Sequence, residues 1–456
     1  MDKMKRPHFS NVVFWLKNKW LRPESQSAYE ASLAYEEMGA GDKHLQDIEK
    51  RFAIVRYAYE HCPFYKNYYD SLGFSPSCLQ SEMDWNQVPI LEKDMIRNGK
   101  EDFVSDEYSV SDLGVSTTGG STGTPLKVYK SKHVHYEVLG WRALRWWGVS
   151  PADNEAILHR RVPTTFKERL INALMWWPTR RAFLSATAIS ESDIVRFLAD
   201  VKKKRIHWMV GYCATLEHVA DYVLRNHIDV QGIKLVWSTS SPLTDIVRRK
   251  IESAFHCQVM DQYGCCEMGH IAVQKPQEDF LTVNSDYVHV DIVDGTGKIL
   301  TDEHGYGDVL ITELKTKEFP LIKYRLGDKS RIVHTMEESS DGFPKMEFVK
   351  GRISDAIWLP DGTYVDGAFL TTICDNYSDF IDCYQIRQGK NYSVNVDFVL
   401  KEGAEGGSES VDSIVRDLRK LLSDKVALSV NIVRDIPDNA GKRKFIISDI
   451  SLSKLS

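Results

Sequence analysis

The chain lacks the features that mark three common classes of protein. Its N-terminal apolar run, Val12–Leu16, is interrupted at Lys17, well short of the ~20 residues that cross a bilayer and of the core of a secretion signal. The eight cysteines are scattered and form no C-x-x-C pair, which argues against a disulfide scaffold and a zinc ribbon. A formal charge of −6 gives no general attraction to nucleic acid or to an anionic membrane.

The remaining composition is that of a globular protein, which we expect in the cytoplasm and without an integral membrane segment. Hydrophobic residues make up 43% of the chain and charged residues 27%, as in folded soluble domains. The length of 456 residues exceeds one ordinary domain and predicts two or three structural units. The basic N-terminal segment around Val12–Leu16 is expected to pack on the body of the protein or on a partner.

Strand-like and helix-like segments alternate through the middle of the chain. This rhythm is typical of a mostly parallel α/β sheet, in which ligands bind beyond the carboxyl ends of the strands. The expected strands are Ala156–Leu158, Trp208–Val210, Lys234–Trp237 and Gln258–Met260. The expected helices are Ser131–Gly148, Ser190–Lys203, Thr215–Asn226 and Leu243–Phe255.

The pattern changes twice in the C-terminal half. Short β segments dominate from Val288, and a second change near Gly351–Asp355 suggests the main domain boundary. We therefore predict an α/β protein with a large domain at 1–350, opening with a helical segment at 1–50, and a small α+β domain at 351–456. In the small domain, Glu402–Ser410 is expected to be irregular, Val411–Leu422 helical and Ala427–Arg434 the final strand.

Glycines and residues with hydroxyl side chains are concentrated in the stretch Val115–Tyr129, which reads V-S-T-T-G-G-S-T-G-T-P-L-K-V-Y. Backbone N–H groups in such a turn form an anion-binding concavity, to which the hydroxyls add donors and Lys127 a positive charge. The stretch differs from a P-loop because Gly123 is followed by Thr-Pro-Leu-Lys and then by a strand rather than a helix. We expect a triphosphate-binding loop between two strands, with an ordinary flexible turn as the alternative.

Two further stretches follow predicted strands. Small residues in Ser238–Leu243, S-T-S-S-P-L, would leave a flat slot for a purine, or serve only as a helix N-cap before Pro242. The segment Asp261–Gly269, D-Q-Y-G-C-C-E-M-G, offers an aromatic ring for a base and a carboxylate for Mg²⁺. Its alternative is a strand-to-helix turn with a capping acid.

Two more stretches lie nearer the C-terminus. The carboxylate in Tyr324–Asp328, Y-R-L-G-D, suits the two hydroxyls of a ribose, or closes an Asx-type turn. The segment Pro437–Lys444, P-D-N-A-G-K-R-K, carries lysines on a glycine-bearing loop, which taken alone indicates solvated charge.

Taken in order, these five stretches resemble the motifs of the adenylate-forming (acyl/aryl-CoA synthetase) superfamily. The resemblance is to its phenylacetate–coenzyme A ligase branch, which includes members associated with capsular polysaccharide loci. The matching segments are S-T-G-T-P-L-K, Y-G-C-C-E, Y-R-L-G-D, a hinge-like G-R-I-S-D and P-x-x-x-G-K. H-C-P-F-Y-K and V-P-I-L-E-K-D also match, so the resemblance runs from about residue 50 to the end.

The resemblance implies a role for each matching residue. The nucleotide-binding residues it implies are Ser121, Thr122, Gly123, Thr124 and Lys127 for the phosphates, Ser240, Asp261, Tyr263 and Gly264 around adenine, and Asp328 for the ribose. The catalytic residues it implies are Glu267 as a Mg²⁺ ligand, Arg352 as a ribose or phosphate contact, and Lys442 between the carboxylate and the α-phosphate. It also implies that the small domain is mobile and closes over the site as a lid.

The implied activity is ATP-dependent conversion of a small carboxylic acid, with an aromatic acid as one candidate, to an acyl-AMP, with release of pyrophosphate and transfer of the acyl group to coenzyme A. One alternative is ligation to an amino acid, a sugar or a carrier protein through an amide or ester. A second alternative is a nucleotide-binding scaffold without turnover. The implied partners are the acid and a thiol or amine acceptor, without nucleic acid, and a homodimer is plausible. The aromatic residues available to line an acid pocket are Trp141, Trp146, Trp147, Trp176, Trp177 and Tyr212.

The chain departs from the family pattern at several positions. Cys266 stands where a hydroxyl residue usually precedes the acid, Gly120 replaces a common Ser or Thr, and Ser354 replaces the hinge acid or lysine. The segment W-L-P-D-G-T-Y also lacks a glycine-rich run, so adenylation is better supported than coenzyme A as acceptor. A zinc site built from Cys265, Cys266, His270 and His289 is disfavoured, because adjacent cysteines chelate one tetrahedral ion poorly.

Overall fold

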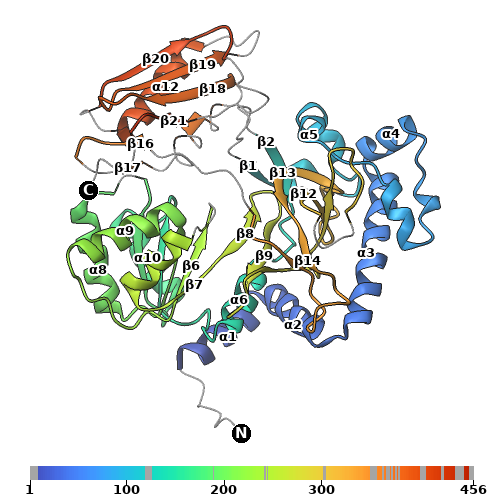
Figure 1. Cartoon of the computed structure of the whole chain (residues 1–456), viewed down its shortest axis with the longest axis horizontal. Helices are drawn as coiled ribbons and strands as arrows, with labels where there is room; N and C mark the ends of the chain where they lie inside the picture. The colour runs from blue at the N-terminus through green and yellow to red at the C-terminus, as the bar shows by residue number, and fades with distance from the viewer. Residues whose placement is uncertain are drawn as a thin grey trace.

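A computed structural model describes the chain over most of its length. The described residues are 9–118, 126–187, 189–240, 243, 245–300, 305–349, 357–361, 364–365, 370, 373–374, 377, 380–400, 407–422, 426–436 and 446–450. The fold is mixed α/β, with helices and one parallel sheet beside several antiparallel sheets (Figure 1).

Helices dominate the first hundred residues and run along the lower and right-hand sides of the molecule (Figure 1). Pro63 follows the end of α3 and occupies the first turn of α4, so the helix breaks where the proline predicts. The α-helices are α1 (Phe9–Leu21), α2 (Pro23–Glu37), α3 (Ala40–His61), α4 (Pro63–Ser71) and α5 (Lys93–Gly99). The 3₁₀ turns are η1 (Pro76–Cys78), η2 (Glu82–Gln87), η3 (Lys100–Phe103) and η4 (Val110–Asp112).

The central sheet is parallel, as the alternating pattern predicts, with the strand order β4-β3-β5-β6-β7. Its strands are β3 (Glu155–His159), β4 (Arg181–Ser185), β5 (Trp208–Tyr212), β6 (Leu235–Thr239) and β7 (Gln258–Met260). Helices α8 (Glu191–Lys204), α9 (Cys213–Arg225) and α10 (Asp245–Phe255) lie together beside this sheet (Figure 1) and share one hydrophobic core with it. The sequence pattern did not predict β4 or the helix before it, α7 (Phe166–Trp176).

Helix α6 (Glu137–Trp146) packs against another part of the parallel sheet. It is shorter than the predicted Ser131–Gly148, and the first six residues of that range are not helical. Ser131 instead bonds outside a helix, since its hydroxyl donates to Glu318 and accepts from the N–H of His133 at 2.9 Å. Such local side-chain bonds compete with helix formation.

Antiparallel strands form three further groups next to the N-terminal helices. The hairpin pairs β1 (Gly114–Thr118) with β2 (Leu126–Lys130), so the glycine-rich loop does join two strands. One sheet has the order β14-β15-β10-β9-β8, built from β8 (Gln262–Cys265), β9 (Gly269–Gln274), β10 (Leu281–Val283), β14 (Ile332–His334) and β15 (Lys345–Met346). Another has the order β11-β12-β13, built from β11 (Val288–Val293), β12 (Gly307–Glu313) and β13 (Tyr324–Ser330).

The C-terminal part has its own hydrophobic core. Its elements are β16 (Ile357–Trp358) paired with β17 (Tyr364–Val365), a sheet of order β20-β19-β18-β21, and α12 (Gly407–Leu422). The sheet strands are β18 (Ile381–Gln388), β19 (Val394–Leu400), β20 (Leu428–Ile432) and β21 (Ile446–Ser448). The predicted boundary at 351–355 lies outside the described residues, and the two-domain division stays a prediction.

Two expectations for this part were wrong. Residues 407–410, expected to be irregular, form the first turn of α12, which precedes the apolar residues Ile414, Leu418 and Leu422 that hold the helix on the core. The strand β20 is not the last one, because β21 follows it and pairs in parallel with β18.

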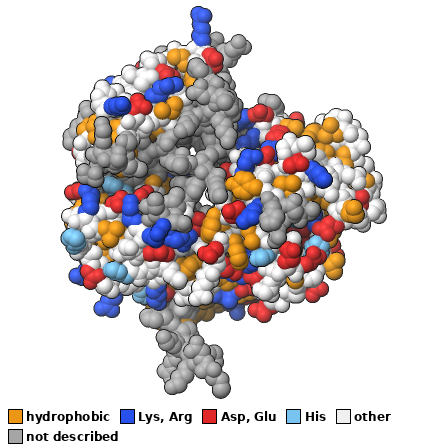
Figure 2. All heavy atoms as spheres, in the orientation of Figure 1, with side chains coloured by type: hydrophobic (Ala, Val, Ile, Leu, Met, Phe, Trp, Pro, Cys, Tyr) orange, Lys and Arg blue, Asp and Glu red, His pale blue; other side chains and the backbone are white. Residues whose placement is uncertain are grey.

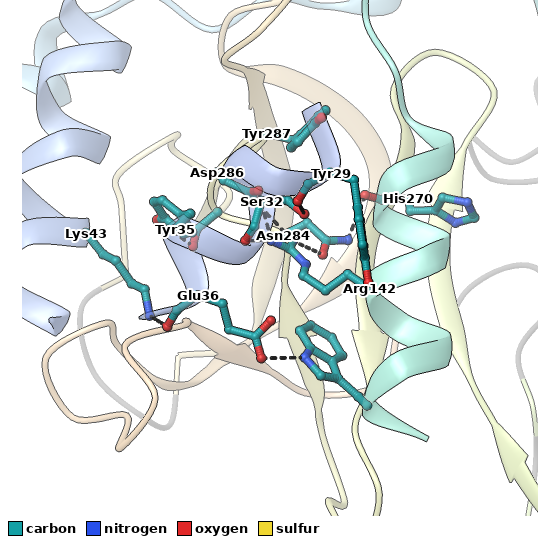
Figure 3. Close-up of polar contacts among 12 residues, drawn as sticks. Tyr29, Ser32, Tyr35, Glu36, Lys43, Arg142, His270, Asn284, Asp286 and Tyr287 are labelled. Atoms are coloured by element: carbon teal, nitrogen blue, oxygen red, sulfur yellow. Dashed lines mark hydrogen bonds and ion pairs between the residues drawn. The ribbon is translucent and has the colours of Figure 1, made fainter. Parts of the chain in front are cut away.

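A buried arginine ties α6 to the antiparallel sheets. The guanidinium of Arg142, fully buried, donates to the two carboxylate oxygens of Asp286 at 2.8 and 2.9 Å and to the side-chain carbonyl of Asn284 at 2.7 Å. It also donates to the backbone carbonyl of Ser32 on α2 at 3.4 Å. Figure 3 draws these contacts where α2, α6 and the chain after β10 meet. The cluster fixes the position of α6, which carries one wall of the site described below.

Replacing Asp286 by Asn is expected to destabilise the fold by about 3–5 kcal/mol, the cost of leaving a buried charge without its partner. Urea unfolding of the variant at pH 7 measures this loss as a lower midpoint. Asp229→Asn is the matched control, because Asp229 is exposed and its substitution should change stability by less than about 0.5 kcal/mol. Equal midpoints for the two variants would contradict the structural role given to Arg142.

Candidate active site

The parallel and antiparallel sheets meet at one residue. Strand β7 ends at Met260 and β8 begins at Gln262, so only Asp261 separates them. The Asp261 carboxylate is buried and accepts a hydrogen bond from the backbone N–H of Gln262 at 2.8 Å. The backbone N–H of Asp261 donates to the side-chain carbonyl of Gln274 at 3.2 Å. This junction carries the predicted segment Asp261–Gly269 to the carboxyl end of the parallel sheet, where ligands bind in such folds.

Two predicted stretches touch each other beyond this junction. The hydroxyl of Tyr263 on β8 donates to a carboxylate oxygen of Asp328 on β13 at 3.0 Å. The hydroxyl of Tyr324, also on β13, donates to Glu267 at 3.3 Å. The structure therefore brings Tyr263, Glu267 and Asp328 into one cluster, although Tyr263 and Asp328 lie 65 positions apart in the sequence.

Gly264 stands at an irregular point of β8, where the register with β9 shifts. A Cβ at this position would lie 2.4 Å from the carbonyl oxygen of Gly269, a distance that no side chain tolerates. Glycine is therefore required for the bulge that carries the chain from Tyr263 toward Glu267.

The hairpin β1–β2 lies against the same segment. The Ser116 hydroxyl on β1 donates to the backbone carbonyl of Cys266 at 3.4 Å, and Lys127 on β2 pairs opposite Thr117. Lys127 is half-buried in this hairpin. The base of the predicted phosphate loop is thus next to Glu267, whereas Ser121, Thr122, Gly123 and Thr124 lie outside the described residues, as do Arg352 and Lys442.

The end of β6 completes this side of the cluster. Ser240 has a φ of 82°, a left-handed conformation that non-glycine residues rarely adopt. The side-chain hydroxyl of Ser238 is buried and has no hydrogen-bond partner among the described residues. Strained backbone and an unpaired polar atom are commonly found where a ligand binds.

A cavity of about 310 Å³ opens beside these residues, between α6 and one face of the parallel sheet. Thr239 and Gln262, the neighbours of Ser240 and Asp261, belong to its lining. Four tryptophans provide most of its apolar wall: Trp141, Trp176, Trp208 and Trp237. The indole N–H of Trp237 donates to the side chain of Gln262 at 2.8 Å, which ties the cavity wall to the junction between the sheets.

Polar groups lie at the other end and along the side of the cavity. Glu155 and Arg181, both nearly buried, form an ion pair at 2.6 Å, and the Arg181 guanidinium lies over the Trp176 ring at 4.1 Å. Burial raises the pKa of Glu155 and lowers that of Arg181. The His270 ring packs on the Trp237 ring. Burial lowers the pKa of His270 to about 4, and the Nδ1 atom of His270 has no hydrogen-bond partner among the described residues. The imidazole is therefore neutral and free to bond a ligand.

Known proteins resemble this chain over most of its length. No protein-family model matches it. Protein CapK of Staphylococcus aureus is 21% identical over 377 residues, covering 80% of each chain. Phenylacetate-coenzyme A ligase of Escherichia coli K12 is 24% identical over 412 residues, covering 85% of this chain and 90% of the relative. The chain is thus similar to the adenylate-forming superfamily and, within it, to the phenylacetate–coenzyme A ligase-like branch.

A solved structure of 2-hydroxyisobutyryl-CoA ligase in complex with 2-HIB-AMP and CoA has the same fold. Its TM-score is 0.59 at 18% identity, and the alignment covers 91% of each chain. The present protein thus has the fold of an adenylate-forming ligase. Within the residues that the structure describes, no helix is both long and apolar enough to traverse a bilayer.

Metal binding at this site would depend on a single protein carboxylate. The described residues contain no group of three or more His, Cys, Asp and Glu side chains suited to a metal ion. Glu267 alone fits a Mg²⁺ ion that takes its other ligands from phosphate oxygens and water, the usual arrangement beside nucleotides. His289, a candidate zinc ligand from the sequence, instead bonds Asp47 and Asp291, both at 3.1 Å.

Only part of the cavity lining was predicted. Trp141 and Trp176 line it as expected, whereas the lining does not include Trp146, Trp147, Trp177 or Tyr212. Sequence reasoning missed Trp208 and Trp237. The sequence signal for these two tryptophans was the two-residue period of strands. Trp208 and Val210 on β5 both line the cavity, and so do Trp237 and Thr239 on β6.

Asp261 should make the stability of this protein depend on pH. Burial raises the pKa of its carboxyl group to about 7, well above its ordinary value of 3.8. Between about pH 4 and 7 the folded state holds a proton that the unfolded state has lost, so stability falls as the pH rises through this window. Asp261→Asn removes this effect, and the variant should gain stability relative to wild type, by up to about 4 kcal/mol at pH 7.5. Urea unfolding at pH 4.5 and 7.5 tests this, and a wild type–variant difference that is the same at both pH values would contradict it.

Proposed function

We propose that this protein uses ATP to convert a small aromatic carboxylic acid to its acyl-AMP, releasing pyrophosphate, and then transfers the acyl group to coenzyme A. The observation that carries the proposal is the continuity of two sites. The cluster of Tyr263, Asp328 and Glu267 adjoins the tryptophan-lined cavity through Gln262 and Thr239. A nucleotide on the first and an acid in the second would meet at the end of β6.

ATP is assigned to the cluster side of this junction. Tyr263 is assigned to the adenine ring, and Asp328, already held by the Tyr263 hydroxyl, to the ribose hydroxyls. The backbone contacts to the nucleotide near Tyr263 are assigned to Ser240, Asp261 and Gly264. Each of these residues lies at a strand end or at a bulge. The phosphates are assigned to Lys127 and to the loop residues Ser121, Thr122, Gly123 and Thr124.

The chemistry needs positioned charge rather than a base. A carboxylate is ionised near pH 7 and attacks the α-phosphorus of ATP, whose bond to the pyrophosphate oxygen breaks. Lys442 and Arg352 are assigned to the negative charge that develops on the transferring group. A Mg²⁺ ion held by Glu267 would supply electrostatic stabilisation of the phosphate oxygens.

The acid is assigned to the cavity between α6 and the parallel sheet. Its volume of about 310 Å³ is that of roughly ten water molecules, enough for an acid with one aromatic ring. The ion pair Glu155–Arg181 lies in register with Leu235, four residues or about 13 Å from Thr239. The aromatic ring of an acid bound among the tryptophans would therefore point toward these polar groups at the far end of the cavity. This arrangement favours an acid whose ring carries an uncharged polar substituent.

Coenzyme A is the favoured acceptor because relatives named as coenzyme A ligases cover this chain almost end to end. Transfer to an amine or hydroxyl acceptor is the second candidate, since W-L-P-D-G-T-Y lacks the glycine-rich run typical of thioester formation. Adding coenzyme A or hydroxylamine to the adenylated enzyme and identifying the product by mass distinguishes them.

Adenylation is tested by pyrophosphate release with a panel of aromatic and aliphatic acids. Glu267→Gln and Lys442→Ala are each expected to lower the rate by about 10²–10³, the loss of one electrostatic donor in a transition state. Lys444→Ala is the matched control, because it removes a lysine two residues away and should leave the rate within about two-fold. Wild-type rates in both Glu267→Gln and Lys442→Ala would remove the site assignment, and no release with any acid would favour a scaffold without turnover.

The acid pocket is tested separately with Gly140→Ala. A Cβ at Gly140 on α6 would lie 3.2 Å from the Trp237 ring, inside the lining. One added methyl group should lower kcat/KM for the acid about ten-fold or more, with little change in the KM for ATP.

Gly41→Ala serves as the control for this variant. Its added Cβ meets no atom within 4 Å, so kcat/KM should be unchanged. An equal loss of kcat/KM in both variants, or a loss seen only in the kinetic constants for ATP, would show that the acid binds elsewhere.

A further inference from the structure

Exposed apolar side chains concentrate on two short segments of the chain. Twenty large hydrophobic residues are exposed among the described residues, and eleven of them lie on α1, on α7 or at Trp177 directly after α7. They are Phe9, Val12, Leu16, Trp20 and Leu21 on the first segment, and Phe166, Leu170, Ile171, Leu174, Met175 and Trp177 on the second. These eleven side chains are named the α1–α7 surface.

The two segments are neighbours in space. The rings of Phe9 and Trp177 meet edge to face with centroids 5.9 Å apart. The Lys17 ammonium donates to the backbone carbonyl of Met175 at 3.3 Å and also to that of Trp177. A cation on the last carbonyls of a helix is a favourable arrangement, and it joins α1 to the end of α7. The eleven side chains therefore belong to one continuous surface.

Both helices are attached to the body by their other sides. On α1, Trp15 stacks on Tyr29 with centroids 4.9 Å apart and Asn18 is buried, whereas Trp20 is 81% exposed. On α7 no residue is buried, although Trp176 rests on Arg181. A helix that is apolar on its inner and outer sides is normally covered on both, and patches of this size mark interaction sites.

Positive charge surrounds this surface although the chain as a whole carries −6. Lys17 and Lys19 lie on α1, and Lys167 and Arg169 lie on α7. The acid among them, Glu168, is engaged by the backbone N–H groups at the start of its own helix. In a dimer with two-fold symmetry this positive surface would face the same positive surface of the second copy. An anionic bilayer, in contrast, complements the positive charge.

We propose that the α1–α7 surface attaches the protein to the surface of an anionic lipid bilayer. The apolar side chains enter the boundary between headgroups and acyl chains, and Lys19, Lys167 and Arg169 bind lipid phosphates. Trp20 and Trp177 suit this depth, because indole combines an apolar ring with a polar N–H. Trp176, on the inner side of α7, also lines the acid cavity, so attachment would bring that cavity close to the bilayer.

The test is co-sedimentation of the full chain with vesicles of phosphatidylcholine alone or mixed with phosphatidylglycerol. Wild type is expected to bind the mixed vesicles and to dissociate with rising salt. The double variant Trp20→Glu/Leu174→Glu should bind at least ten-fold more weakly. The matched control is Leu72→Glu/Met83→Glu, which changes two apolar side chains that are also exposed but lie outside the surface, and it should bind as wild type does.

A charge series separates the electrostatic part of the binding. Lys19→Gln and Lys167→Gln should each weaken binding to the mixed vesicles by about five-fold at low salt. None of these variants touches the assigned active site, so pyrophosphate release stays at the wild-type rate, and a failure of adenylation would leave this result unaffected.

Three outcomes would overturn the proposal. One is absence of binding to mixed vesicles. Another is equal binding of the double variant and its control. The third is a dimer in vesicle-free buffer, measured by light scattering, that Trp20→Glu/Leu174→Glu converts to a monomer, because the surface would then be covered by a second copy.

Discussion

The passage of the chain from one sheet to the other through Asp261 is the constraint on which the site depends. With a single residue between β7 and β8, the first strand of the antiparallel sheet must begin at the carboxyl edge of the parallel one. That edge is where the ends of parallel strands leave space for ligands. Tyr263 and Glu267 follow within six residues of the junction, and β13 brings Asp328 against Tyr263. The burial of a carboxyl group at the junction, which opposes its ionisation, is the cost of this compact connection.

The acid cavity depends on a second constraint, the fixed distance between α6 and the parallel sheet. The bidentate pair of Arg142 with Asp286 holds α6 from one side (Figure 3), and Trp237 meets Gly140 from the other. Because α6 has no side chain at Gly140, a ring-sized space remains beside the tryptophans. On the face seen in Figure 2, lysine and arginine side chains are interspersed with acidic ones. This face thus shows no broad electrostatic preference, and local groups must provide specificity there.

The sequence was informative where one local signal determined the structure. Alternating segments predicted the parallel sheet, Pro63 predicted the helix break, and motif order predicted that Tyr263, Glu267 and Asp328 belong together. It was uninformative where burial depends on distant partners. The strand β4 is a short apolar segment that only its neighbour β3 distinguishes from a loop, and Trp208 joins the cavity only because β5 lies beside β6. Helix α7 has an apolar outer side that no contact within the described part of the chain explains, so a pattern based on burial could not find it.

The most direct test of the account is a crystal structure with an unreactive acyl-adenylate analogue, such as adenosine bearing an arylacetyl sulfamate. The account predicts adenine against Tyr263, the ribose hydroxyls on Asp328 and the aryl ring between α6 and Trp237. An analogue bound away from the junction at Asp261, or one whose aryl ring lies outside the tryptophan-lined cavity, would contradict it.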